Sequence, residues 1–252
     1  MKMKFSFFLR ALFAPALALA VASTSVFADD QTSATKPVYR GGEWRGYTQQ
    51  FNRHIATATA ALNKGTAKLL FFGDSITEGW NSGGRAVWNT HYASRNAINL
   101  GLSGDRTQNV LYRMDKLPLD KVKPKAVVLL IGYNNITATY NGKSTPRETA
   151  EGIKAVVTRI KKIYPSTKIL VLHVLPAANL TEVKRIKEIN ALLPSLLRSE
   201  RNVTLLDLTS SFADKKGKIL PALSGDGIHL NKKGYEVWAT KMEPVLKKLL
   251  NE

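Results

Sequence analysis

Five runs of apolar, largely β-branched residues recur along the chain. They are AKLLFF from Ala67, AINL from Ala97, AVVLLIG from Ala126, KILVLHVL from Lys168 and VTLLDL from Val203. Continuous apolar runs without strict alternation are typical of strands that are buried on both faces of a parallel sheet. We therefore expect five parallel strands, each covered on both sides.

Helical patterns occupy the segments between these runs. The clearest follows the third run, where Thr145 can cap a helix, Pro146 suits its first position, Glu148 completes a capping box and Pro165 ends it. Further helices are expected from about Tyr47 to Asn63, from about Glu182 to Arg198 with a kink at Pro194, and from about Lys232 to Leu250 behind Asn231 with a bend at Pro244. Strands that alternate with helices predict one doubly wound α/β domain.

The N-terminus has the three-part pattern of a secretory signal peptide. Lys2, Lys4 and Arg10 precede or enter an apolar run, and small residues at Val26 and Ala28 follow it. A membrane anchor is the alternative, but the apolar run is shorter than the roughly 20 residues that span a bilayer. We expect residues 1–28 to be removed on export to the periplasm or the medium, residues 29–45 to form an irregular lead-in, and residues 46–252 to form the domain.

Charge and cysteine content narrow the choice of function. Without the three cations of the first 28 residues, 34 of the 37 Lys and Arg residues remain against 19 acidic residues, a net charge of +15. Such a charge favours peripheral contact with anionic surfaces, but the cations are scattered, so nucleic-acid binding ranks last. The chain has no cysteine, which excludes a thiol nucleophile, thiolate metal ligands and disulfides.

Residues of types that often take part in catalysis follow four of the expected strands. Asp74 and Ser75 follow the first, Gly104 follows the second, Asn134 follows the third, and a segment after the fifth holds Asp226 and His229. Ligands bind beyond the carboxyl ends of the strands in such sheets. These residues are therefore expected to meet at one edge.

Their chemistry fits a serine hydrolase. A serine hydroxyl needs a base, for which an imidazole is suited, and the imidazole in turn needs an acceptor, which a carboxylate three residues earlier can provide. Ser75, His229 and Asp226 match these roles. The N–H groups of Ser75 and Gly104 and the Asn134 amide can form an oxyanion hole, with Asp74 in support.

Each residue also has an ordinary structural explanation, and it is the joint occurrence at four strand ends that favours catalysis. Ser75 or Asp74 could cap a helix, and Asn134 could form a turn. Ser103 lies in GLSGD, which only partly matches a nucleophile elbow, and is expected to present Gly104. His173 is expected to be a satisfied core residue, and no histidine spacing predicts a metal site or another cofactor.

The blocks GDSITEGW, NLGLSGDRT, IGYNN and DGIHLNKKGYEVW occur in that order and resemble those of the GDSL, or SGNH, hydrolase superfamily. The branch that they resemble is that of the catalytic subunits of platelet-activating factor acetylhydrolase. The resemblance implies a three-layer flavodoxin-like fold with strand order 2-1-3-4-5 and metal-free ester hydrolysis. It implies the same roles for Ser75, Gly104, Asn134, Asp226 and His229.

Two departures from the family pattern concern the substrate. Ile76 stands in place of the leucine that names the motif, and Tyr133 replaces a small residue and is expected to narrow the acyl pocket. We predict an exported esterase that acts on short-chain esters, acetyl first, of a carbohydrate or a lipid. The alternatives are a lysophospholipase or thioesterase, and a glycan-binding module that uses some of its tryptophans at 44, 80, 88 and 238.

Overall fold

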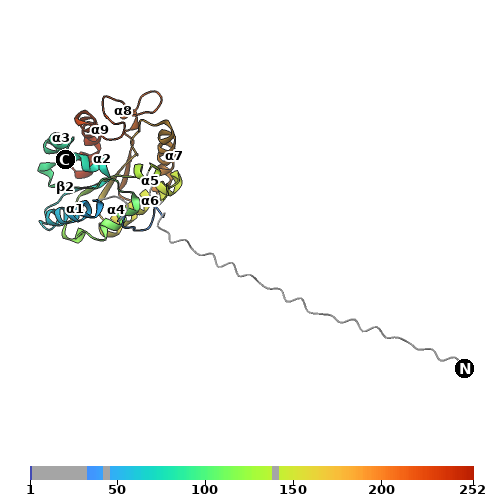
Figure 1. Ribbon diagram of the computed structural model, residues 1–252. Helices are drawn as coiled ribbons and strands as arrows, with labels where there is room; N and C mark the ends of the chain where they lie inside the picture. The colour runs from blue at the N-terminus through green and yellow to red at the C-terminus, as the bar shows by residue number, and fades with distance from the viewer. Residues whose placement is uncertain (2–32, 42–45, 138–141) are drawn as a thin grey trace. The chain divides into compact units, whose positions relative to one another are not determined.

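The computed structural model describes Met1 and residues 33–41, 46–137 and 142–252 (Figure 1). The expected signal peptide, residues 1–28, therefore lies almost wholly outside the described residues, as do two parts of the expected lead-in. The described part of that lead-in, residues 33–41, contains no helix or strand. The described residues from Ser33 onward form one compact unit.

The five expected strands form one parallel sheet with the order β2-β1-β3-β4-β5, so this prediction is confirmed. The strands are β1 (Leu69–Gly73), β2 (Ala97–Gly101), β3 (Ala126–Leu130), β4 (Lys168–Leu172) and β5 (Val203–Leu206). The helices are α1 (Tyr47–Leu62), α2 (Ser75–Glu78), α3 (Arg85–His91), α4 (Thr107–Met114), α5 (Tyr133–Thr137), α6 (Pro146–Ile163), α7 (Leu180–Leu197), α8 (Thr209–Phe212) and α9 (Lys232–Leu250). Short 3₁₀ turns cover Gly79–Asn81, Ala93–Arg95 and Leu119–Lys121.

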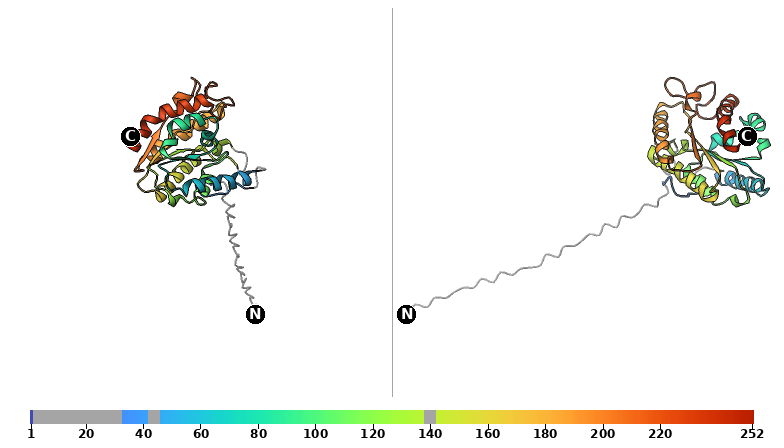
Figure 2. Two further views of the ribbon diagram at one scale, coloured as in Figure 1. Left: turned by 90° about the vertical axis from the view of Figure 1, so that its left-hand side faces the viewer. Right: turned by 180° about the vertical axis from the view of Figure 1, so that it is seen from behind.

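Helices cover both faces of the sheet, which makes three layers (Figures 1 and 2). Side chains alternate along each strand, so β1 sends Leu70 and Phe72 to one core and Leu69 and Phe71 to the other. The first core contains buried residues of α1, α4, α6 and α7, and the second contains those of α2, α3, α8 and α9. This double burial is why the strands read as continuous apolar runs.

Local sequence signals explain where the long helices begin. Thr145 caps α6 and forms the expected capping box with Glu148. Asn179 accepts hydrogen bonds from the N–H groups at 181 and 182, so α7 starts at Leu180, slightly before the expected residue. Both α7 and α9 continue through their internal prolines, Pro194 and Pro244.

The fourth strand is shorter than its apolar run. β4 ends at Leu172, although the run continues to Leu175. The Asn190 side chain on α7 binds both the N–H and the C=O of Val174, each at 2.9 Å, and so replaces the neighbouring strand as hydrogen-bond partner. None of the described helices has the length and hydropathy needed to cross a membrane.

Candidate active site

The register of the sheet aligns the strand ends that carry the candidate residues. Gly73, the last residue of β1, pairs with Gly101 at the end of β2 and with Leu130 at the end of β3. The segments that follow, with Ser75, Gly104 and Asn134, therefore start at one level of one sheet edge. A side chain at Gly73 would approach Leu130 O to 2.4 Å, so glycine is required for this close packing.

The structure brings Ser75, His229 and Asp226 together. Ser75 Oγ lies 2.9 Å from His229 Nε2, and His229 Nδ1 lies 2.6 Å from Asp226 Oδ2. The serine is the first residue of α2, whereas the histidine and aspartate lie in the segment before α9. Residues 154 positions apart thus meet in the order serine, imidazole, carboxylate, which allows proton transfer from hydroxyl to imidazole.

The segment that carries Asp226 and His229 is held by its own hydrogen bonds. Asp226 Oδ1 accepts from the N–H groups of Ile228 and His229, at 2.9 and 2.8 Å. Burial opposes ionisation of Asp226, but the bonds from the His229 ring and from these two N–H groups outweigh it and lower the pKa of this carboxyl. Asp226 is therefore an anion at neutral pH and can orient the imidazole.

Asp74 acts as the helix cap, so Ser75 does not. Its Oδ1 accepts from Ile76 N at 3.0 Å, and the side chain is buried. Burial, followed by the nearby charge of Asp105, raises the pKa of Asp74 to about 7, against the bond from Ile76 N, which lowers it. The capping explanation thus applies to Asp74, while the Ser75 hydroxyl faces His229.

The expected oxyanion donors lie on the two neighbouring strand ends. Gly104 follows β2 in a turn and has φ +77°. Asn134 lies in α5, and its Nδ2 donates to Asp105 O at 3.0 Å. A side-chain amide has two N–H hydrogens, so this bond fixes the amide and leaves its second hydrogen for another acceptor.

Charged residues that the sequence analysis did not select support this edge of the sheet. Glu78 Oε2 accepts from Ser103 N at 2.9 Å and from the Ser103 hydroxyl, which confirms Ser103 as part of the Gly104 loop. Arg40 donates to Ser103 O, and the fully buried Arg113 binds Asp105. Glu78 closely follows the GDS block and Arg113 lies in the helix after the SGDR block, but no sequence signal pointed to Arg40.

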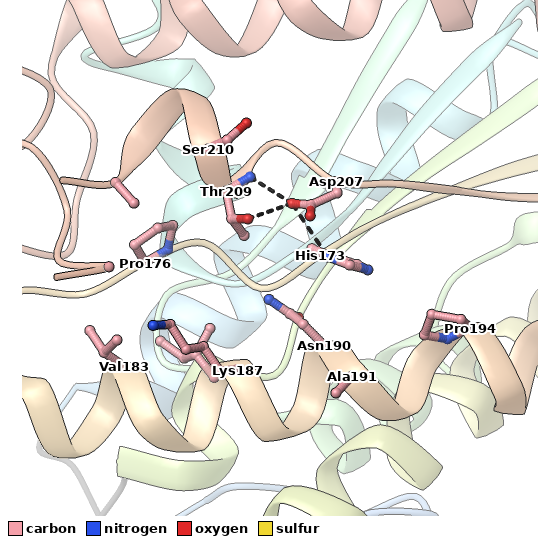
Figure 3. Close-up of a pocket in the computed structure, with 13 residues that line it drawn as sticks. His173, Pro176, Val183, Lys187, Asn190, Ala191, Pro194, Asp207, Thr209 and Ser210 are labelled. Atoms are coloured by element: carbon pink, nitrogen blue, oxygen red, sulfur yellow. Dashed lines mark hydrogen bonds and ion pairs between the residues drawn. The ribbon is translucent and has the colours of Figure 1, made fainter. Parts of the chain in front are cut away.

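A pocket of about 420 Å³ lies away from these residues, between α7 and the segment from β5 to α8 (Figure 3). His173 lines it directly after β4 and is not the satisfied core histidine that we expected. Its Nδ1 lies 3.4 Å from Asp207 Oδ1, whereas its Nε2 has no hydrogen-bond partner among the described residues. Ser210 points away from this histidine in Figure 3, so His173 and Asp207 do not form a second catalytic triad with Ser210.

The described part of the chain has no cluster of three or more His, Cys, Asp or Glu side chains arranged to hold a metal ion. The tryptophans that it includes are mostly buried, and Trp80 and Trp238 have no exposed surface. Trp88 is partly buried and packs against the second core. Trp44 lies outside the described residues. A stacking surface for sugars is therefore not formed by Trp80 or Trp238.

Comparison with known proteins identifies the family. The model of the GDSL-like lipase/acylhydrolase family matches residues 71–237. Rat platelet-activating factor acetylhydrolase IB subunit alpha2 is 32% identical over 186 residues, which cover 73% of this chain and 78% of the relative.

Two solved structures share the fold. A GDSL-like lipase from Bacteroides thetaiotaomicron has a TM-score of 0.66 at 21% identity and covers 79% of this chain and 97% of its own. A mutant acetylxylan esterase from Geobacillus stearothermophilus has a TM-score of 0.56 at 19% identity, with coverage of 71% and 93%. With its family model matched over most of the domain, the chain belongs to the GDSL-like lipase/acylhydrolase family and is a carboxylic ester hydrolase.

Proposed function

We propose that the protein is an exported serine esterase that hydrolyses short-chain esters, acetyl first, of a carbohydrate or a lipid. Ser75 is the nucleophile, His229 the general base and Asp226 the group that orients the imidazole. The observation that carries this proposal is the pair of contacts, Oγ to Nε2 at 2.9 Å and Nδ1 to Oδ2 at 2.6 Å.

The reaction runs through an acyl-enzyme. Ser75 Oγ attacks the ester carbonyl while His229 Nε2 takes the hydroxyl proton, and the imidazolium returns this proton to the leaving alcohol. Water then attacks the acyl-serine while His229 accepts a proton from it, and the imidazolium returns this proton to Ser75 Oγ as the acid is released. The N–H groups of Ser75 and Gly104 and the Asn134 amide stabilise the oxyanion in both steps.

Two arguments favour a short acyl group. The rat relative is named an acetylhydrolase, and the bacterial structural neighbour is named an acetylxylan esterase, so the acetyl group is common to both names. In this chain Tyr133 precedes Asn134, and its hydroxyl donates to Glu182 on α7 at 2.8 Å. This bond fixes a mostly buried ring next to Asn134 in the chain. Burial, the bond to Glu182 and then the nearby charges of Asp226 and Asp74 raise the pKa of its hydroxyl, so the ring lies close to these two carboxylates. We propose that the ring limits the room for a long acyl chain.

Export rests on the pattern of the first 28 residues. Expression of the full chain in a bacterial host, followed by N-terminal sequencing of protein from the periplasm or the medium, tests it. Processing after Ala28 is the expected result. Retention of an unprocessed chain in the cytoplasm would contradict export and leave the esterase proposal untouched.

The esterase is tested with p-nitrophenyl esters from acetate to octanoate and with acetylated xylan and lysophospholipids. Wild type should prefer acetate, and Ser75→Ala should lose turnover while its circular dichroism is unchanged. Ser210→Ala, which alters a serine in the pocket of Figure 3, is the matched control and should keep full activity. A preference for long acyl chains would instead support a lysophospholipase or thioesterase, and turnover by Ser75→Ala would refute the assignment.

A further inference from the structure

The loop that carries Gly104 is a β-turn whose type depends on the orientation of one peptide. Asp105 N donates to Leu102 O at 3.2 Å, and Gly104 occupies the third position of this turn with φ +77°. A positive φ at the third position is the mark of a type II turn, whereas a type I turn has a negative φ there. The two types differ by a flip of the central peptide, which here joins Ser103 to Gly104.

That peptide decides whether Gly104 can act as an oxyanion donor. In a trans peptide the C=O of Ser103 and the N–H of Gly104 point in opposite directions. A flip of the peptide therefore reverses the N–H of Gly104. Whatever holds Ser103 O in place also sets the direction of the donor.

Arg40 holds this oxygen. Its Nη1 donates to Ser103 O at 2.9 Å, and its guanidinium carbon lies 4.8 Å from the centre of the Tyr47 ring. A Cβ built on Gly104 would lie 1.9 Å from the same Nη1, so the guanidinium packs directly against this glycine. Hydrogen bonds from a charged donor are stronger than neutral ones and polarise the peptide that accepts them.

Arg40 comes from the N-terminal segment, residues 33–41, which is bound to the domain. Val38 exchanges hydrogen bonds with α4, through its N–H to Gln108 O at 3.1 Å and its C=O from Asn109 Nδ2 at 3.0 Å. Ala34 O accepts from the Thr107 hydroxyl at 2.7 Å. These contacts fix the backbone from which Arg40 reaches the turn.

We propose that Arg40 is a positioning residue for ester hydrolysis, which holds the Ser103–Gly104 peptide so that the Gly104 N–H points at the oxyanion. The inference rests on the proposed function, because it needs Gly104 to be a donor. Glu78 fixes the preceding peptide from the other side through Ser103 N, so the turn is held at two successive peptides. The N-terminal segment thereby contributes to catalysis without contacting the substrate.

The test compares Arg40→Met, Arg40→Lys and the control Arg53→Met, which alters an exposed arginine of α1. Complete loss of an oxyanion donor costs about 10²–10³ in kcat. Since Arg40 acts through the donor, Arg40→Met should lower kcat for p-nitrophenyl acetate about 10- to 100-fold, with KM within about twofold. Arg40→Lys keeps one charged donor and should recover part of the loss, and Arg53→Met should match wild type.

A second measurement separates positioning from general damage. A trifluoromethyl ketone forms a tetrahedral adduct with a serine and places an oxyanion in the hole, so its affinity should fall in parallel with kcat/KM in Arg40→Met. The melting temperature should change little. An unchanged kcat, an unchanged ketone affinity beside a lower kcat, or a loss of activity that only follows a loss of folding would each overturn the inference. Ser75→Ala distinguishes the two proposals, because its activity tests the nucleophile whatever Arg40 does.

Discussion

The buried ion pair of Arg113 and Asp105 gives a quantitative test of what holds the site together. Arg113 Nε lies 2.5 Å from Asp105 Oδ2, and neither side chain has exposed surface. Arg113 also donates to Leu100 O at 2.8 Å and to Gly73 O at 3.2 Å, which lie at the ends of β2 and β1. One guanidinium thus serves a carboxylate and two strand ends beneath the proposed site.

Replacement of Arg113 by methionine preserves much of the volume but leaves these partners unpaired. Breaking a buried pair by removing one member costs about 3–5 kcal/mol, and an unsatisfied buried acceptor costs about 1–3 kcal/mol. The terms overlap, so we expect a loss of at least about 4 kcal/mol in the free energy of unfolding. This is a large part of the roughly 5–15 kcal/mol that stabilises a typical domain.

Urea unfolding followed by circular dichroism measures this loss. The control is Arg159→Met, because Arg159 pairs with Asp115 at the surface, where such pairs contribute less than about 1 kcal/mol. Addition of Asp105→Asn to Arg113→Met removes the unpaired charge and should restore part of the stability. If Arg113→Met costs no more than the surface control, the argument that this edge depends on a paired buried charge is wrong.

Four further predictions follow from single groups. Asp226→Asn should lower kcat by about 10³-fold or more, because an amide favours the wrong tautomer of His229, and Tyr133→Ala should raise octanoate turnover relative to acetate about tenfold or more in the ester series. Burial, and then the charge of Arg113, lowers the pKa of His54 to about 3 in the folded protein. Below about pH 6.5 the unfolded chain therefore binds a proton that the folded chain does not, so the free energy of unfolding falls as the pH falls. His54→Gln should weaken this dependence of the free energy of unfolding on pH in urea titrations. Burial raises the pKa of Asp74 to about 7 in the folded protein, so the wild type loses stability as the pH rises from about 4 to about 7, the opposite sign to His54. Asp74→Asn lacks this group, so its free energy of unfolding should rise relative to that of the wild type over the same pH range.

The sequence predicted the sheet because the signals for it are local. Each strand is a short apolar run, and a buried parallel sheet requires only that both faces of such strands are covered. The resemblance supplied the strand order. The apolar run predicts a longer β4 than the structure has, because His173 N still donates to Leu206 O of β5 but Val174 is bound by the side chain of Asn190 on α7, and no local pattern encodes that contact.

The groups with candidate chemistry were also accessible to sequence reasoning, for a different reason. Ser75, Gly104 and Asn134 closely follow strand ends, and the parallel topology places strand ends at one edge. His229 lies farther along the chain, between α8 and α9, and its three-residue spacing from Asp226 was the signal for it. The structure brings Ser75 and His229 within hydrogen-bond distance, as that reasoning required. Their chemical roles remain predictions that the variants above test.

The residues that support the site escaped notice because charge alone is ambiguous. Arg40, Glu78 and Arg113 read as ordinary solvated residues, since a charged side chain usually lies at the surface. Arg113 is buried because it satisfies two strand ends and a carboxylate at once, and because α4, which carries it, packs into the first core and is also contacted by residues 34 and 38. A polar stretch such as GDRTQN after a strand can therefore lie either at the surface or in a buried hydrogen-bond network. Only the elements that cover it in the folded chain decide which. It follows that the reacting groups of such a site can be inferred from strand order, whereas the groups that aim them must be found from burial and pairing in the folded chain.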